Sequence, residues 1–289
     1  MKIKKILNQN AVLVEENGEE KVAIGKGIGF NKKRNDLLLP HEIERIFVLE
    51  AEGQMKLQSL LNQIDEKYLF AAEKIIDHAE NILMETLNEH VLIALTDHLA
   101  FAAENLKNGI IIRNKLLPEI EVLYPEEFQV AQWAVGYLVQ TLDVPYTYDE
   151  AGYIAIHLHS ARAGERSKHQ SIREVTIVSE IVRLIEQELA IDLRAKTMAL
   201  NYTRLVNHLR LLLQRYHNQQ YATLDDEIVQ MVKMKYPASF EIAKKIRVLL
   251  LKTYQLSTTS EELGYLAIHI ERLRLAGQER KSQKESEEL

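Results

Sequence analysis

The chain has 289 residues, and 46% of them are hydrophobic, which is enough apolar material for two or three compact domains. The net charge is −6 at pH 7, and the absence of cysteine excludes disulfide bonds, thiolate catalysis and cysteine-ligated zinc sites. No apolar run approaches the roughly 18 residues that a membrane-spanning helix needs, and the start of the chain lacks the apolar segment of a signal peptide. The composition predicts a cytoplasmic protein that is not inserted into a membrane.

The segment 1–34 is basic although the whole chain is acidic. It carries eight Lys or Arg side chains against four Glu, a net charge of +4. Such an asymmetry suggests that this end of the chain meets a polyanion. A solvated run of charges at a chain terminus would give the same composition, so charge alone leaves both interpretations open.

The segment 1–56 is predicted to form a small antiparallel β-unit. The apolar runs AVLV, at 11–14, and KVAIG, at 21–25, flank Asn17-Gly18, a dipeptide that favours the turn of a β-hairpin. A further strand, IERIFVLE, follows Pro40. A unit of this size buries little apolar surface by itself, so we expect it to associate with a second copy.

A glycine-rich loop, IGKGIGF at 24–30, follows the hairpin. It does not match the Walker pattern, so we expect no nucleotide there, but glycine also lets one backbone approach another closely. Cations for phosphates and an aromatic ring for base stacking make an RNA-binding surface one interpretation. An ordinary turn with surface lysines is the other. The side chains concerned are Lys26, Phe30, Lys32, Lys33 and Arg34.

Beyond a polar joint that begins at Gly53 (GQMKLQS), the chain is predicted to be helical. Apolar residues recur at steps of three and four in 69–83 and in 130–142, as they do on the buried face of a helix. We expect most of these apolar side chains, and the sole tryptophan, Trp133, to lie in the core without a cofactor.

The helical part contains a tandem duplication. GYIAIH at 152–157 and GYLAIH at 264–269 lie 112 positions apart, and the stretch from the preceding Tyr-Pro to each histidine aligns without a gap. Upstream, LTDHLAFAAEN matches LVNHLRLLLQR at a distance of 110 positions. A period this long indicates duplicated domains, since solenoid repeats run to roughly 50 residues. Each copy therefore has two histidines: His98 and His157 in the first, His208 and His269 in the second.

The second histidine of each copy is predicted to lie on a helix that begins with a capping box. Thr147 and Glu150 form this box in the first copy, and Thr259 and Glu262 form it in the second. A second polar joint, GERSKHQS, separates the copies, and the charged end of the chain is expected to fray.

Metal binding is not favoured for these histidines. His157 and His159 are two positions apart, so on a helix they point to nearly opposite sides and cannot hold one ion together. A lone histidine often only completes a helix interface, but two per copy in matching surroundings favour a functional role. A neutral imidazole is a nucleophile near pH 7 and can accept a phosphoryl group, whose charge can break or make an interface. We expect no metal, no cofactor and no catalytic residue.

Arginine side chains surround the second pair of histidines more densely than the first. A phosphoryl group there could accept charge-assisted hydrogen bonds instead of meeting repulsion. We therefore expect phosphorylation of the second copy to strengthen the association of two chains and phosphorylation of the first copy to weaken it. Arg210, Arg215, Arg272 and Arg274 stand in the second copy where the first has Ala100, Asn105, Ser160 and Arg162.

Taken together, these segments resemble the sugar-responsive transcriptional antiterminators of the BglG/SacY/LicT type over nearly the full length. The resemblance rests on ILNQNAVLV, IGKGIGF and ERIFVL in the first segment and on the doubled DHLAFA/NHLRLL and GYIAIH/GYLAIH motifs. It implies an α+β multidomain protein: a small antiparallel β-sheet RNA-binding domain, which dimerises, followed by two tandem all-α helical bundle domains, the phosphotransferase-system (PTS) regulation domains. The implied boundaries are 1–56, 57–170 and 171–280, with a disordered tail at 281–289.

The resemblance also implies partners and site residues. The β-domain is expected to clasp a leader mRNA antiterminator hairpin and keep the terminator from forming. Contacts with RNA are expected from Asn10, Gly25, Lys26 and Phe30, with Lys5 and Lys32 on phosphates. Lysine at 26, where some members have arginine, keeps the charge but loses the planar fork.

The same resemblance implies a phosphoryl donor for each repeat. The sugar permease's enzyme II component is expected to phosphorylate His98 and His157 and to switch the protein off when its sugar is absent. The phosphocarrier HPr is expected to phosphorylate His208 and His269 and to switch it on.

Two other classes of protein fit the sequence less well. DNA-binding regulators with the same helical repeats carry a helix-turn-helix head and further transferase domains, whereas this head is β-rich and 289 residues leave no space for such additions. A histidine phosphotransferase enzyme is not favoured, because no nucleotide loop or metal cluster is found in the sequence.

Overall fold

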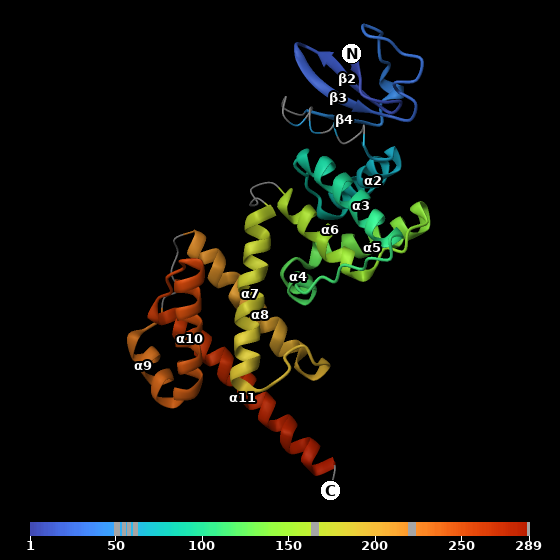
Figure 1. Cartoon of the computed structure of the whole chain (residues 1–289). Coiled ribbons are helices and arrows are strands. Elements are labelled where there is room, and N and C mark those ends of the chain that lie inside the picture. The colour runs from blue at the N-terminus through green and yellow to red at the C-terminus, as the bar shows by residue number, and fades with distance from the viewer. Residues whose placement is uncertain are drawn as a thin grey trace. The chain divides into compact units, whose positions relative to one another are not determined.

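The computed structural model describes residues 1–48, 63–162, 168–218 and 224–287, together with Gly53, Lys56 and Ser59. The chain forms two compact units (Figure 1). The first unit comprises Met1–Asn114 and Glu126–Lys168, and the second comprises Lys115–Pro125 and His169–Leu289. None of the described helices is both long enough and apolar enough to cross a membrane.

The first unit begins with a four-stranded antiparallel sheet in the order β1-β2-β3-β4 (Figure 1). The predicted hairpin is confirmed, because Glu16 pairs with Glu19 and both residues of the turn between them, Asn17 and Gly18, have positive φ angles of 55° and 85°. A register shift interrupts the pairing of β1 with β2 between Ile3 and Lys5. The strands are β1 Lys2–Ile6, β2 Ala11–Glu16, β3 Glu19–Ile24 and β4 Arg45–Phe47.

The sheet buries a small apolar cluster. Two neighbours of the buried Leu38, Leu37 and Leu39, are largely exposed on the segment that leads to β4. A core of this size supplies little stability alone, and these exposed leucines leave apolar surface for a partner to cover. The cluster consists of Ile3, Val12, Val14, Ala23, Ile28 and Leu38.

Within the described stretches 63–114 and 125–162, four helices follow the sheet, and the expected helical periodicity is confirmed. The carboxylate of Asp65 caps the first of them by accepting from the backbone N–H of Lys67 at 3.1 Å. The second helix packs against the first and the last. These helices are α2 Glu66–Leu83, α3 His90–Lys107, α5 Pro125–Leu142 and α6 Tyr148–Ser160.

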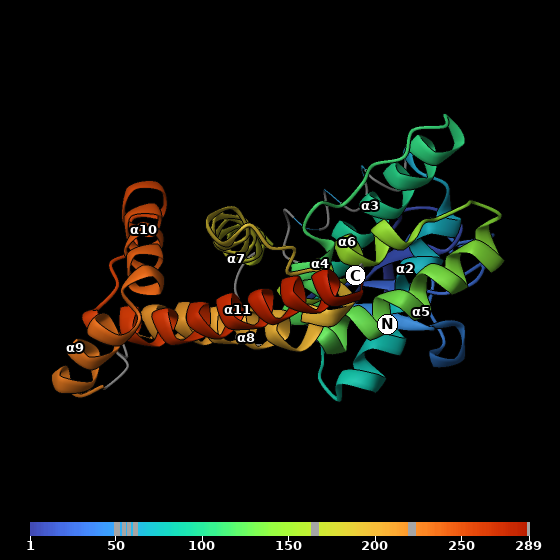
Figure 2. The ribbon, with the colours of Figure 1, turned by 90° about the horizontal axis from the view of Figure 1, so that it is seen from below.

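The second unit contains the matching helices of the second repeat. The last helix packs against the two helices that precede it and runs alongside α8, as Figure 2 shows. Two short 3-10 turns, Pro40–Glu42 in the first unit and Lys196–Met198 in the second, complete the described structure. The helices are α7 Lys168–Leu189, α8 Ala199–His217, α9 Asp226–Lys235, α10 Pro237–Tyr254 and α11 Ser260–Glu287.

One helix of the first repeat belongs to the second unit. This helix, α4 (Leu117–Leu123), packs mainly against α8 of the second unit. Its fully buried Glu119 accepts a hydrogen bond from Arg194 at 2.6 Å. The matching helix of the second repeat, α9, instead packs against its own neighbours, α10 and α11.

Trp133 does not lie in the core, contrary to our expectation. Its side chain is 40% exposed on α5. The indole stacks on the His78 ring at a centroid distance of 3.7 Å and on Tyr137 at 5.4 Å. The buried stripe of α5 passes through Val130, Ala131 and Ala134, and position 133 lies outside it. The second repeat has Lys245 here, paired with Glu188 at 2.7 Å.

The ends and joints of the repeats also differ from expectation. The last helix, α11, continues through Glu287, so the expected frayed tail is helical over 281–287. The second joint is shorter than expected because α7 already begins at Lys168. Residues 164–167 of this joint, residues 288–289 and most of the first joint lie outside the described residues.

Candidate functional site

Two loops meet at one end of the sheet, the β1–β2 loop and the glycine-rich loop after β3. The backbone N–H of Gly25 donates to the carbonyl of Asn10 at 3.0 Å, and the N–H of Gly29 donates to the carbonyl of Gln9 at 2.8 Å. The side-chain oxygen of Asn10 accepts from the N–H of Gly27. Asn10 thus fixes the shape of the loop, and its amide nitrogen donates to Glu66.

The glycines of this loop permit close backbone approach, as their sequence suggested. A Cβ atom on Gly25 would collide with the carbonyl oxygen of Glu42, and one on Gly29 would collide with that of Asn8. Gly27 has open space around it but a φ of +69°, which side chains of L-residues rarely adopt. A side chain at any of the three positions would distort the loop.

The loop presents some of the predicted RNA-contacting residues and withholds others. Phe30 is 61% exposed, and Lys26 and Lys5 are also exposed. Lys32 is half-buried and pairs with Glu42 at 2.7 Å. Gly25 is buried, so we expect it to support the shape of the loop and not to contact RNA through an exposed surface of its own. The exposed pair of an aromatic ring and a lysine on a rigid loop suits stacking on a base beside a phosphate.

Each helical repeat brings its two histidines together. The rings of His98 on α3 and His157 on α6 have a centroid distance of 5.3 Å. In the second repeat, His208 on α8 and His269 on α11 are 4.4 Å apart. A tyrosine from α6 or α11 lies beside each pair, at 5.5 Å from the His98 ring and 6.1 Å from the His208 ring.

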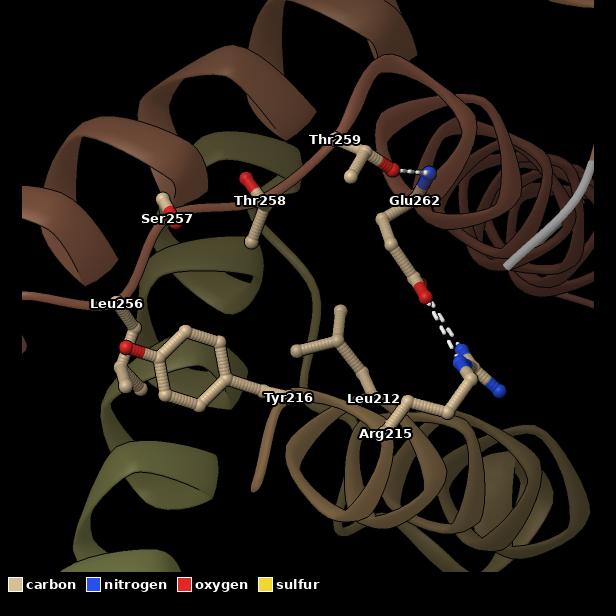
Figure 3. Close-up of a pocket in the computed structure, with 8 residues that line it drawn as sticks. All are labelled: Leu212, Arg215, Tyr216, Leu256, Ser257, Thr258, Thr259 and Glu262. Atoms are coloured by element: carbon tan, nitrogen blue, oxygen red, sulfur yellow. Dashed lines mark hydrogen bonds and ion pairs between the residues drawn. The ribbon is translucent and has the colours of Figure 1, made fainter. Parts of the chain in front are cut away.

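The helix that carries the second histidine of each repeat, α6 or α11, also carries a glutamate, and this glutamate has a different partner in each repeat. In the first repeat, Glu150 lies 3.0 Å from Nε2 of His98. In the second, the matching Glu262 accepts two hydrogen bonds from Arg215, at 2.8 and 2.9 Å (Figure 3). Nε2 of His208 is buried, and among the described residues it has no hydrogen-bond partner.

These surroundings keep the second pair of histidines neutral. Burial lowers the pKa of His208 to about 3, with the nearby His269 and Arg215 acting in the same direction. Burial also lowers the pKa of His269, with Arg272 and Arg204 adding to the effect. A neutral imidazole retains a lone pair on one ring nitrogen and can act as a nucleophile.

The predicted capping boxes are wrong in the first copy and only half formed in the second. The hydroxyl of Thr147 is buried and makes no hydrogen bond within the described chain, and the N–H of Glu150 donates to the Thr147 carbonyl instead. The Glu150 side chain turns to His98. In the second copy, Oγ1 of Thr259 does accept from the N–H of Glu262, at 3.4 Å. The Glu262 carboxylate turns away from the helix end to Arg215.

The structure also places the other residues that the sequence singled out. His157, which is 5% exposed, faces His98, while His159 turns to Glu127 on α5 at 2.9 Å, so the two point apart as predicted. Among the described residues, no three His, Cys, Asp or Glu side chains form a group that could hold a metal ion. Arg274 is paired with Glu271 at 2.7 Å, and Arg215 is paired as well.

A small β-sheet with an aromatic and basic loop, joined to two helical repeats with paired histidines, is the architecture of a regulatory nucleic-acid-binding protein. Sequence models of two domain families match the chain: the CAT RNA binding domain over residues 1–56, and the PRD domain over residues 73–161 and 179–273. The chain belongs to the family of transcription antiterminators that combine a CAT RNA-binding domain with PRD domains.

Relatives from two bacteria match almost the whole chain. The chain is 34% identical over 276 residues to the transcription antiterminator LicT of Bacillus subtilis strain 168, and the match covers 94% of this chain and 99% of the relative. It is 36% identical over 282 residues to the beta-glucoside operon antiterminator of Dickeya chrysanthemi, covering 96% and 99%. The crystal structure of GlcT CAT-PRDI matches 56% of this chain and 98% of its own, with a TM-score of 0.52 and 36% identity. The expected family and fold class are confirmed.

Proposed function

We propose that this protein is a sugar-responsive transcriptional antiterminator that binds a hairpin in leader RNA and prevents the overlapping terminator from forming. The exposed Lys26 and Phe30 on a glycine loop within the CAT domain carry this proposal. The loop is braced by Asn10 and Gln9, so a base and a phosphate would meet a preorganised surface. Such a protein acts on nascent transcripts in the cytoplasm.

The active form is proposed to be a homodimer through the β-domain. The small apolar cluster of the sheet and the exposed Leu37 and Leu39 support this proposal, because a second copy would cover apolar surface that the single sheet leaves in water. The proposed domain boundaries are those of the sequence: 1–56 for the RNA-binding domain, and 57–170 and 171–280 for the two PTS regulation domains.

Phosphorylation of the paired histidines is proposed to control the dimer. The lone pair of an acceptor nitrogen forms the new N–P bond while the bond between the phosphorus and its carrier residue on the donor protein breaks, and the electron pair of that bond returns to the carrier residue. The histidines act as acceptors in a regulator, not as catalysts of an enzyme. The enzyme II component is the proposed donor to His98 and His157, and HPr is the proposed donor to His208 and His269.

Termination readthrough on a leader template is the experiment that tests the RNA proposal. We expect Lys26→Ala to weaken RNA binding by the full chain about fivefold to tenfold and to reduce the salt dependence by roughly one phosphate contact. We expect Phe30→Ala to weaken binding at least tenfold through lost stacking. Lys21→Ala is the matched control, since Lys21 pairs with Glu16 at 3.1 Å near the hairpin turn, away from the loop.

Loss of readthrough in the Lys21→Ala control, or normal readthrough in both loop variants, would contradict the proposed surface. A DNA-binding regulator would instead shift a duplex DNA probe and leave readthrough unchanged. For control by phosphorylation, the double variant His98→Ala, His157→Ala is expected to give readthrough without the inducing sugar. Strict dependence on the inducer at normal protein levels would count against an inhibitory first repeat.

A further inference from the structure

The two repeats differ at one position next to their histidine pairs. Asn105 of α3 and Arg215 of α8 occupy this position, and their spacing in sequence equals that between His98 and His208. Arg215 reaches across to α11 and holds Glu262 with two hydrogen bonds (Figure 3). Asn105 is too short to do the same for Glu150.

In the first repeat, the glutamate is free to hold the histidine. Glu150 is buried and lies 3.0 Å from Nε2 of His98. The side-chain nitrogen of Asn105 is buried and finds no hydrogen-bond partner among the described residues, so it does not compete for the carboxylate. Because a carboxylate only accepts, the proton of a neutral His98 lies on Nε2 and the lone pair lies on Nδ1.

In the second repeat, the arginine removes that partner from the histidine. The fork of Arg215 faces both oxygens of Glu262, and Nε2 of His208 is left buried without a hydrogen bond in the described structure. The charged or titratable groups around His208 are His269, Tyr265, Arg215 and, behind Arg215, Glu262. No carboxylate is paired with this imidazole within the described chain.

The space beside Asn105 in the first repeat differs from the space beside Arg215 in the second. A pocket of about 270 Å³ adjoins His98 and Glu150, lined by Asn105 and several apolar side chains. In the second repeat, Arg215 and Tyr216 stand where Asn105 and Leu106 stand in the first, and the pocket of about 10 Å³ beside them is lined by Leu256–Thr259 and not by His208. The first repeat therefore has room for an arginine at this position.

We propose that Glu150 and Glu262 are positioning residues for the histidine pairs, and that the residue at 105 or 215 decides whether each glutamate holds a histidine or an arginine. This inference rests on the proposed function for its consequence. A phosphoryl group on Nδ1 of His98 would add negative charge to a ring whose Nε2 already faces the Glu150 carboxylate, and Asn105 offers it no cation. A phosphoryl group on His208 would meet Arg215, whose fork can pass from Glu262 to the phosphate. One exchanged residue thus gives phosphorylation opposite effects in the two repeats.

Exchanging the residues at 105 and 215 tests the positioning roles of Glu150 and Glu262. The full chain is labelled with ¹⁵N-histidine, and NMR reports the protonation of the ring nitrogens. In Arg215→Asn, the freed Glu262 is expected to reach His208, fix its proton on Nε2 and raise its proton affinity at least a hundredfold. In Asn105→Arg, His98 is expected to lose its hydrogen-bonded Nε2–H signal. Assignments come from His98→Gln and His208→Gln.

Two matched controls separate the charge from the geometry. Asn105→Ala is expected to leave the His98 signal unchanged, and Arg215→Lys, which keeps the charge without the fork, is expected to release Glu262 in part. Unchanged His208 signals in Arg215→Asn, or an intact His98 signal in Asn105→Arg, would overturn the positioning roles. If Arg215→Asn fails to fold by circular dichroism, the Asn105→Arg arm decides, because the first repeat has room for the new side chain.

A second experiment uses phosphorylated HPr to test whether Arg215 determines how phosphorylation changes the dimer. In the wild-type chain, phosphorylation of the second repeat is expected to lower the dimer dissociation constant about tenfold, and Arg215→Asn is expected to abolish or reverse this change. An unchanged response in Arg215→Asn would overturn the sign-setting role. Failure of any histidine to accept phosphate would instead refute the proposed function, while the NMR exchange would still decide the positioning roles.

Discussion

His159 of α6 and Glu271 of α11 occupy matching positions in the two repeats, and they supply opposite halves of the same buried contact. His159 meets the carboxylate of Glu127 at 2.9 Å. Glu271 is itself the carboxylate, and it accepts from the hydroxyl of Ser239, the residue that matches Glu127, at 2.8 Å. An arginine three residues after each position completes both contacts. Both repeats therefore keep this set of contacts, but the carboxylate lies on α5 in the first repeat and on α11 in the second.

This exchange predicts that His159→Glu destabilises the first unit and that adding Glu127→Ser restores it. The single change would set a second carboxylate against the buried Glu127, and we expect the free energy of unfolding to fall by about 1–3 kcal/mol. The double change would copy the arrangement of the second repeat. Urea unfolding followed by the fluorescence of Trp133, the sole tryptophan, measures both.

The two changes should therefore be strongly non-additive. Glu127→Ser alone is expected to be destabilising as well, because it leaves His159 and Arg162 without their shared carboxylate. A double variant as unstable as the sum of the two single variants would show that the repeats do not share one interchangeable network.

Acid should weaken the second unit through His208. An unfolded histidine binds a proton near pH 6.5, whereas burial lowers the pKa of His208 in the folded chain to about 3. The unfolded chain therefore binds more protons in this range, and stability falls as the pH drops below about 6.5, by roughly 1.4 kcal/mol per pH unit. His208→Gln should lose this part of the pH dependence, measured by urea unfolding at pH 7.5 and 5.5 with helix circular dichroism. Equal pH dependence in the two proteins would contradict a buried neutral His208.

Gly136→Ala is expected to stabilise the first unit by about 0.5–1 kcal/mol, because alanine lowers the conformational entropy of the unfolded chain and improves the helix propensity. Gly136 lies inside α5 on an exposed face, and a Cβ atom there would meet nothing within 4 Å. The change therefore has no steric cost. The unfolding midpoint in urea should rise, and a fall would show that the glycine serves a contact beyond the described chain.

Gly25→Ala should have the opposite effect. The new methyl group would overlap the carbonyl oxygen of Glu42, so either the glycine loop or the turn at Pro40–Glu42 must shift. We expect RNA affinity to fall at least tenfold together with the stability of the β-domain, even though Gly25 itself is buried. Normal RNA binding by this variant would show that the loop shape is not needed for recognition.

Features that depend on neighbouring residues could be predicted from the sequence. The hairpin at Asn17-Gly18 follows from the backbone freedom of those two residues, and the helices follow from apolar spacing. The duplication singled out His98 and His157 as candidate functional residues, although it did not predict that their rings lie together.

Features that depend on a side chain's choice between competing partners could not be predicted from the sequence. The motif at Thr147 and Glu150 satisfies a capping box, yet the carboxylate takes a histidine from another helix, 52 residues away in sequence. Local spacing does not reveal that competition. The Arg215–Glu262 pair was missed for the same reason, although the change from Asn105 to Arg215 between the copies was a visible signal.

The assignment of α4 to the second unit means that the chain passes between the units three times, after Asn114, Pro125 and Lys168. A single protease cut introduced after Lys168 would leave α4 on the amino-terminal fragment, with its buried Glu119 still docked onto Arg194 of the other fragment. The nicked protein should therefore behave as a split protein that complements itself, and its two halves should elute together until they are denatured.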